Sequence, residues 1–133
     1  MNADQRELFD AALRAYGNAH APYSNFPVGA AVRSSSGRVF AGCNVENAAY
    51  PQGWCAEASA IAAMVTAGER EIVAVLVLAG GDEVITCCGG CRQKLVEFAD
   101  RDVPVWSCDL GGIRAEHTLG TLLPNAFGRG WAR

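Results

Sequence analysis

The amino-acid sequence predicts an α/β protein, a three-layer α/β/α sandwich around a mixed, mostly parallel sheet of about five strands. The first observation behind this prediction is the segment 72–78, which is apolar at every position. Such a run is typical of a strand that is covered on both faces. The second observation is that apolar runs and helical patterns alternate along the chain. Because strand–helix–strand units normally cross over onto a parallel pairing, this order favours helices packed on one sheet.

The first part of the chain predicts a helix and then a β-hairpin. Over residues 5–16 the apolar side chains recur at helical spacing, and Gly17 is suited to end the helix. These side chains are Leu8, Phe9, Ala12, Leu13 and Tyr16. Two apolar runs follow at 28–33 and 39–45. The short segment of serines and a glycine that joins them predicts two antiparallel strands.

The remaining elements alternate between helix and strand. Residues 55–67 contain neither proline nor glycine and are rich in alanine, which predicts a helix. The apolar strand 72–78 follows, and 88–98 is predicted as a further helix. A short strand at 103–110 and a weak helical turn at 116–123 complete the prediction.

Length, charge and composition restrict the class of protein. With 133 residues, the chain is predicted to form one domain, residues 1–133. Its formal net charge is −3, and no basic block is present, which favours a small-molecule substrate over a nucleic acid polymer. No apolar stretch approaches the length of a membrane span, and the first residues lack an apolar signal segment, so we expect no membrane association. A cytoplasmic location is therefore predicted.

Three of the six cysteines lie within residues 87–91, and three explanations compete: a disulfide cluster, a structural metal site or a catalytic metal site. In a reducing cytoplasm, clustered cysteines more often bind metal than form disulfides. Cys88 and Cys91 are three apart in the first turn of a predicted helix, and Cys55 opens the other internal helix. Two helix N-termini at one sheet edge would therefore bring together three soft ligands, for which zinc is the best match.

The predicted site leaves the fourth metal position open and places an acid beside it. Neither His20 nor His117 has a partner at ligand spacing, whereas Cys87 is a candidate fourth ligand of a structural site. Three protein ligands and a vacant position would instead describe a catalytic zinc. Glu57, two residues after Cys55, is placed to act there as a general acid and base.

Five stretches, in register over nearly the whole chain, resemble the cytidine deaminase family. Two of them are Cys55-Ala56-Glu57 and the C-G-G-C-R-Q stretch at 88–93, which match motifs that open two helices in that family. The other three are Y-S-N-F-P-V-G-A-A at 23–31, C-N-V-E-N-A-A-Y at 43–50, and L-L-P-N-A-F-G at 122–128.

The resemblance implies one zinc ion per chain, held by Cys55, Cys88 and Cys91, and a catalytic Glu57 that moves protons between the attacking water and the base. It also implies the substrate-binding residues. The backbone N–H of Ala56 would contact the ring carbonyl, Phe26 would pack on the base, and Asn44 and Glu46 would bind the sugar hydroxyls. Short members of the family are usually homotetramers with shared active sites, so Tyr50 and Phe127 are positions that could reach a neighbouring site; a dimer would be the smaller assembly.

Three positions depart from the family pattern. Cys87 stands where proline is usual, Ala58 stands where many short members carry an arginine that balances the thiolates, and a bulky Trp54 precedes the first ligand. These departures leave the substrate open between cytidine or deoxycytidine and a modified cytosine nucleoside such as blasticidin S. Two further functions compete with nucleoside deamination, those of a polynucleotide deaminase and of a structural zinc protein. The prediction is a zinc-dependent hydrolase acting on a free aminopyrimidine nucleoside.

Overall fold

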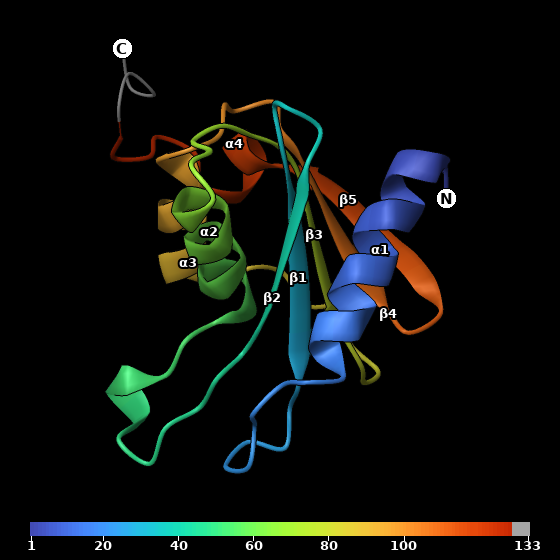
Figure 1. The fold of residues 1–133 in the computed structure, drawn as a ribbon, viewed down its shortest axis with the longest axis vertical. Coiled ribbons are helices and arrows are strands. Elements are labelled where there is room, and N and C mark those ends of the chain that lie inside the picture. Colours follow the sequence, from blue (N-terminus) through green and yellow to red (C-terminus); the bar gives the residue numbers. More distant parts are fainter. Residues whose placement is uncertain (129–133) are drawn as a thin grey trace.

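The computed structural model describes residues 1–128, and within them one mixed five-stranded sheet has the order β2-β1-β3-β4-β5 (Figure 1). The strands are β1 (Val28–Ser34), β2 (Val39–Cys43), β3 (Ile72–Ala79), β4 (Pro104–Asp109) and β5 (Gly112–Thr118). The helices are α1 (Ala3–Tyr16), α2 (Ala56–Thr66), α3 (Gly89–Val96), α4 (Leu119–Leu122) and the 3-10 turn η1 (Tyr50–Gln52). The predicted α/β class and the mixed sheet are confirmed.

The prediction that this sheet is mostly parallel is wrong. Of the strand pairings described, β3 with β4 is parallel, whereas β1 pairs antiparallel with both β2 and β3, and β4 pairs antiparallel with β5. The crossover rule correctly predicts the directions of the strands that are joined through helices, because β2, β3 and β4 are all parallel to one another. The expectation that such strands are neighbours in the sheet is wrong for β2 and β3, because β1 lies between them. Because α2 follows β2 and α3 follows β3, and these two strands run in the same direction, both helices begin at the same end of the strands.

The C-terminal part of the sheet contains a strand that the sequence prediction lacks. Residues 112–118 form β5, so the helical turn expected at 116–123 is limited to α4, residues 119–122. β5 closes a hairpin with β4 through a turn in which Gly112 has a φ of 133°, a conformation that favours glycine. The pair Gly111-Gly112 is the sequence feature that indicates this turn.

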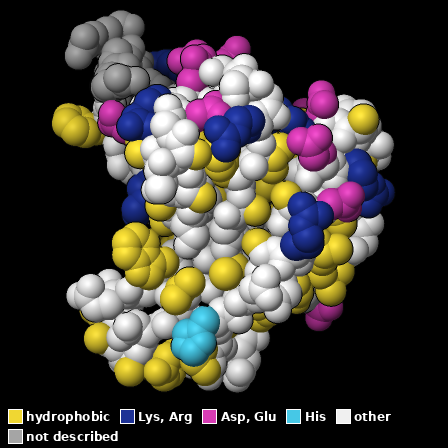
Figure 2. All heavy atoms as spheres, viewed as in Figure 1, with side chains coloured by type: hydrophobic (Ala, Val, Ile, Leu, Met, Phe, Trp, Pro, Cys, Tyr) yellow, Lys and Arg dark blue, Asp and Glu magenta, His cyan; other side chains and the backbone are white. Residues whose placement is uncertain are grey.

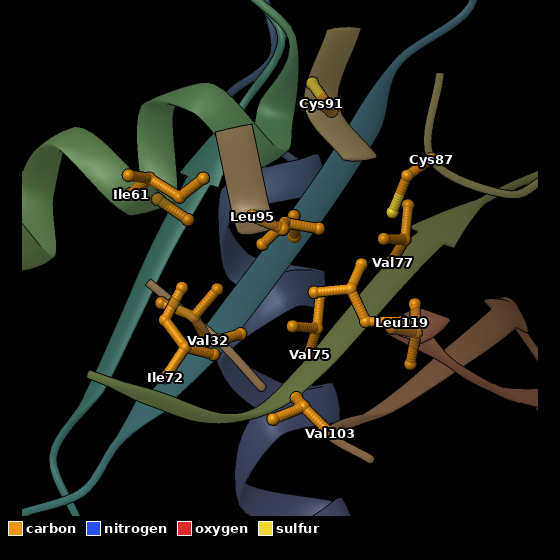
Figure 3. Close-up of a cluster of buried hydrophobic side chains, with 14 of the residues drawn as sticks. Val32, Ile61, Ile72, Val75, Val77, Cys87, Cys91, Leu95, Val103 and Leu119 are labelled. Carbon is orange, nitrogen blue, oxygen red and sulfur yellow. The ribbon is translucent and has the colours of Figure 1, made fainter. Parts of the chain in front are cut away.

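Helices cover both faces of the sheet, as the three-layer prediction requires (Figure 1). α1 packs on one face, against a cluster that includes Ala31, Leu76 and Leu78. α2 and α3 pack on the other face, against a cluster that includes Val75 and Val77 (Figure 3). Successive residues of β3 therefore enter opposite cores, which explains why the segment lacks polar residues.

Two glycines allow the helices to approach the sheet closely. A Cβ at Gly42 of β2 would lie 2.4 Å from the backbone nitrogen of Ala60 in α2, and one at Gly29 of β1 would lie 2.1 Å from the carbonyl oxygen of Ala12 in α1. Any side chain at Gly42 would push α2 away from the sheet. The position of the α2 N-terminus therefore depends on this glycine.

The visible surface mixes charges of both signs. Figure 2 shows Lys, Arg, Asp and Glu side chains around the end of the molecule that carries the N-terminus, and several hydrophobic side chains on the loops that project from the opposite end. Within residues 1–128, no helix combines the length and the apolar character needed to cross a membrane.

Candidate metal centre and active site

Three cysteines from two helix N-termini form one cluster. Cys55 is the N-cap of α2, Cys88 is the N-cap of α3, and Cys91 lies in the first turn of α3. The three sulfur atoms all lie within 4.8 Å of one another, and those of Cys55 and Cys88 are 3.7 Å apart. The fold therefore joins ligands that are separated by more than thirty residues in the sequence.

This geometry fits a tetrahedral zinc ion. With Zn–S bonds of about 2.3 Å, two sulfurs at the corners of a tetrahedron lie about 3.8 Å apart. The 3.7 Å between the sulfurs of Cys55 and Cys88 matches that edge. The sulfur of Cys87 is outside the cluster, as are both histidines, so the described residues supply three ligands. Three ligands leave one corner for an exchangeable group, which is the arrangement of a catalytic zinc site.

The helix N-terminus affects the Cys88 thiol. Burial would raise the pKa of Cys88, but hydrogen bonds from the backbone and side chain of Cys91 and from Cys55 outweigh it, and the net pKa is lowered. Burial instead raises the pKa of Cys55 and Cys91 in the absence of a metal charge. Bound zinc would have to displace protons from these two thiols, which links metal binding to pH.

Glu57 is a buried carboxyl group next to the thiol cluster. It lies in the first turn of α2 and is only 4% exposed. Burial raises the pKa of Glu57, while a hydrogen bond with the Cys87 thiol and the positive charge of Lys94 partly oppose that increase. An acid that must both accept and donate a proton near neutral pH requires such a raised pKa.

A pocket of about 360 Å³ opens beside the cluster, and this volume is in the range of small-molecule sites. Seven of the predicted site residues line it: Asn44, Glu46, Tyr50, Cys55, Ala56, Glu57 and Cys88. Cys91 is fully buried behind them. The wall also includes Ile85 and Thr86, which the sequence analysis missed because neither has a side chain that indicates chemistry. Trp54 lines the pocket as well, with 59% of its surface exposed.

The two predicted sugar-binding side chains are already fixed by hydrogen bonds to the first residue of β1 and to the loop that precedes it. The Asn44 amide accepts from the backbone N–H of Val28 at 2.9 Å and donates to the carbonyl of Phe26 at 2.9 Å. The Glu46 carboxylate accepts from the backbone N–H groups of Tyr23 and Ser24 and from the Ser24 hydroxyl. The hydroxyl of Ser24 contributes most to lowering the pKa of Glu46. Both groups keep further hydrogen-bonding capacity that a ligand could use.

The predicted aromatic residues differ in their relation to the pocket. Tyr50 is 74% exposed at its rim and makes an edge-to-face contact with Tyr23. Phe26 precedes β1 and is not among the residues that line the pocket. Phe127 is 89% exposed near the end of the described chain, where its carbonyl accepts from the side chain of Gln93. The roles of Phe26 and Phe127 in substrate binding stay predictions.

The fold and this site together define a thiolate-liganded metal centre of the catalytic type, with a buried acid facing a small-molecule pocket. The comparisons with known proteins agree with this class. The model for the cytidine and deoxycytidylate deaminase zinc-binding region matches residues 2–107. Because that match covers most of the sequence, the chain belongs to this family of zinc-dependent deaminases.

Individual relatives match over almost their full lengths. The chain is 39% identical over 126 residues to the cytidine deaminase of Sporosarcina psychrophila, covering 95% of this chain and 93% of that protein. The crystal structure of cytidine deaminase from Burkholderia pseudomallei superposes with a TM-score of 0.86 at 40% identity, over 96% of this chain and all of that chain. The cytidine deaminase of Mycobacterium tuberculosis gives a TM-score of 0.81 at 37% identity, over the same shares of the two chains.

Proposed function

We propose that this chain catalyses the hydrolytic deamination of a free aminopyrimidine nucleoside, cytidine or deoxycytidine, to uridine or deoxyuridine and ammonia. The observation that carries the proposal is the buried Glu57 at a pocket wall formed by the thiols of Cys55 and Cys88. The names of the relatives support cytidine as the substrate.

Cys55, Cys88 and Cys91 would hold the zinc ion. Bound zinc lowers the pKa of a coordinated water and so supplies a nucleophile at neutral pH. Glu57 would take a proton from the attacking water and deliver it to the ring nitrogen. It would then take the remaining proton from the hydroxyl added at C4 and deliver it to the departing amino group, so that the C4–N bond breaks, a C4 carbonyl forms and ammonia leaves. The raised pKa of Glu57 suits both transfers.

The remaining predicted residues would orient the nucleoside. Ala56 is the first residue of α2, where backbone N–H groups lack intrahelical partners, so its N–H is free to bind the ring carbonyl. Asn44 and Glu46 would bind the sugar hydroxyls from positions that are held by the start of β1 and the loop before it. Because these groups are fixed before binding, the substrate would lose less affinity to ordering them.

We also propose a homotetramer and a cytoplasmic location. Tyr50 at the pocket rim and Phe127 are large exposed aromatic side chains that assembly would cover. Six free thiols are compatible with a reducing compartment. Sedimentation equilibrium of the zinc-loaded protein tests the oligomer, since a monomer at micromolar concentration would contradict it.

The substitution Glu57→Gln tests the proposed chemistry. The amide keeps the shape of the side chain but cannot transfer protons, so turnover should fall by about 10²–10⁴-fold while zinc remains bound. Glu71→Gln is the control, since it removes an exposed carboxylate before β3, at the opposite end of that strand from the pocket. It should leave both turnover and zinc content unchanged. Full activity of Glu57→Gln would contradict the proposal. Cytidine, deoxycytidine and blasticidin S, compared by ultraviolet absorbance, would identify the substrate.

A further inference from the structure

A zinc site with three thiolate ligands carries negative charge that nearby groups have to compensate. Zinc(II) bound to three thiolates carries a net charge of −1, and the N-termini of α2 and α3 offset only part of it. The adjacent Glu57 carboxyl adds to the negative charge whenever it is ionised. A nearby positive side chain would stabilise the loaded site, but the residue after Glu57 is the small and buried Ala58.

Arg92, the arginine next to Cys91, is fixed by hydrogen bonds to neutral groups outside the three clustered thiols. Its guanidinium donates to the carbonyl of Cys87 at 2.7 Å, to the carbonyl of Leu122 at 2.8 Å and to the hydroxyl of Thr86 at 2.7 Å. These three acceptors fix it between the loop before α3 and the end of α4. Burial raises the pKa of Cys87, and the charge of Arg92 partly opposes this rise, but Cys87 is not one of the three clustered thiols.

Lys94, unlike Arg92, lines a cavity that borders the thiol cluster. This second cavity of about 250 Å³ adjoins the site, and its wall contains Cys55, Ala58 and Lys94 together. The Lys94 side chain turns back along α3, so that its Nζ lies 3.6 Å from the point where a Cβ on Gly90 would be. This places the ammonium group over the first turn of α3, the turn that contains Cys91.

A further observation is consistent with an unneutralised charge on Lys94. No ion pair of Lys94 with a carboxylate occurs within residues 1–128. Ala58, with its small side chain, lines this cavity between Cys55 and Lys94.

We propose that Lys94 is an electrostatic positioning residue of the metal centre, whose ammonium group balances the negative charge of the zinc–thiolate set across the cavity beside Ala58. Removing this charge should weaken zinc binding, because the loaded site is more negative than the protonated apo site. At a separation of several ångströms in a partly solvated cavity, the effect on the zinc dissociation constant should be about three- to tenfold.

The test measures zinc transfer from purified holoprotein to a chromogenic chelator at low salt and at 1 M salt. Lys94→Gln should raise the zinc dissociation constant about three- to tenfold at low salt and less at high salt. Lys94→Arg keeps the charge and should behave like the wild type. Arg6→Gln removes an exposed charge from α1, on the opposite face of the sheet, and should change nothing.

The double variant Ala58→Arg with Lys94→Gln moves the charge from α3 to α2 and should restore zinc retention, which a purely structural role of Lys94 would not allow. The inference is overturned if Lys94→Gln retains zinc as Arg6→Gln does, or if the double variant binds no better than Lys94→Gln alone. It rests on the proposed zinc centre, but the two fail differently. A wild-type protein that binds no zinc would refute the centre, whereas equal zinc binding by the variants would refute only the role of Lys94.

Discussion

The side chain of Arg92 connects three segments around the metal ligands, and its removal should be costly. Its three hydrogen bonds go to Thr86 and Cys87 in the loop that enters the site and to Leu122 at the end of α4. A hydrogen bond with a charged partner contributes about 1.5–3 kcal/mol when buried. Because Arg92 is only half-buried, we take the lower end and expect Arg92→Met to cost about 3–5 kcal/mol. Methionine keeps most of the apolar stem, so the loss is mainly polar.

A loss of this size is a large part of the stability of a domain, which is typically about 5–15 kcal/mol. For a chain of this length it should lower the melting temperature by roughly 10–15 °C. Thermal and urea unfolding, followed by circular dichroism, measure it at saturating zinc, because bound metal adds stability of its own. Zinc should also dissociate faster from the variant, since Cys88 follows the carbonyl that Arg92 holds.

Arg70 provides a matched control for this measurement. Its guanidinium also donates to backbone carbonyls, those of Val65 at 2.9 Å and Glu69 at 3.1 Å, but the side chain is exposed. Water can replace these bonds, so Arg70→Met should cost less than about 1 kcal/mol. The reasoning fails if Arg92→Met is no less stable than Arg70→Met.

Three further predictions concern the helices and the thiols. Gly42→Ala should cost about 1–3 kcal/mol in urea unfolding, since its Cβ would overlap α2, whereas Gly17→Ala meets nothing closer than 3.5 Å and should be nearly neutral; equal stabilities would contradict the close approach. Cys87→Ser should keep one zinc per chain by metal analysis, because its sulfur lies outside the cluster; loss of zinc would instead support a fourth ligand. Zinc affinity should fall as the pH falls, by roughly two to three decades per pH unit below the thiol pKa values, because protons compete for the thiols. Burial raises the pKa of Cys55 and Cys91, so this loss should already be present at neutral pH, and an affinity that is constant between pH 6 and 8 would contradict it.

The sequence predicted the metal ligands because their pattern is mostly local. Cys88 and Cys91 share one helical turn, and each internal helix begins at a cysteine. Cys55 lies close to Cys88 and Cys91 because α2 and α3 begin at the same end of the strands. That condition depends on strand direction, which the crossover rule supplies. The error about strand adjacency therefore left the site prediction unaffected, since β2 and β3 point the same way although β1 separates them.

The missed features have weak sequence signals. β5 alternates apolar and polar residues only from Ile113 to Glu116 and then continues with two polar residues, so the Gly111-Gly112 turn is its clearest indication. Ile85 and Thr86 reach the pocket because of the path of the loop after β3, although their side chains resemble those of any loop.

Charge compensation at the site could not be predicted from the sequence for a related reason. A ligand is recognised by its element and its spacing, whereas a compensating charge acts through space and can come from any segment that faces the metal. Lys94 is three residues after Cys91, which placed it on a helix, but only the packing of α3 against α2 directs its ammonium group toward the cavity beside Ala58. The same packing acts on the pKa of Glu57 in two opposing ways. Burial raises this pKa, and the Cys87 thiol and the Lys94 charge partly oppose the increase. A charge that balances the thiolates therefore also acts on the acid, and moving it to position 58 should separate the two effects. Zinc retention would then return, while the pH dependence of turnover would differ from that of the wild type.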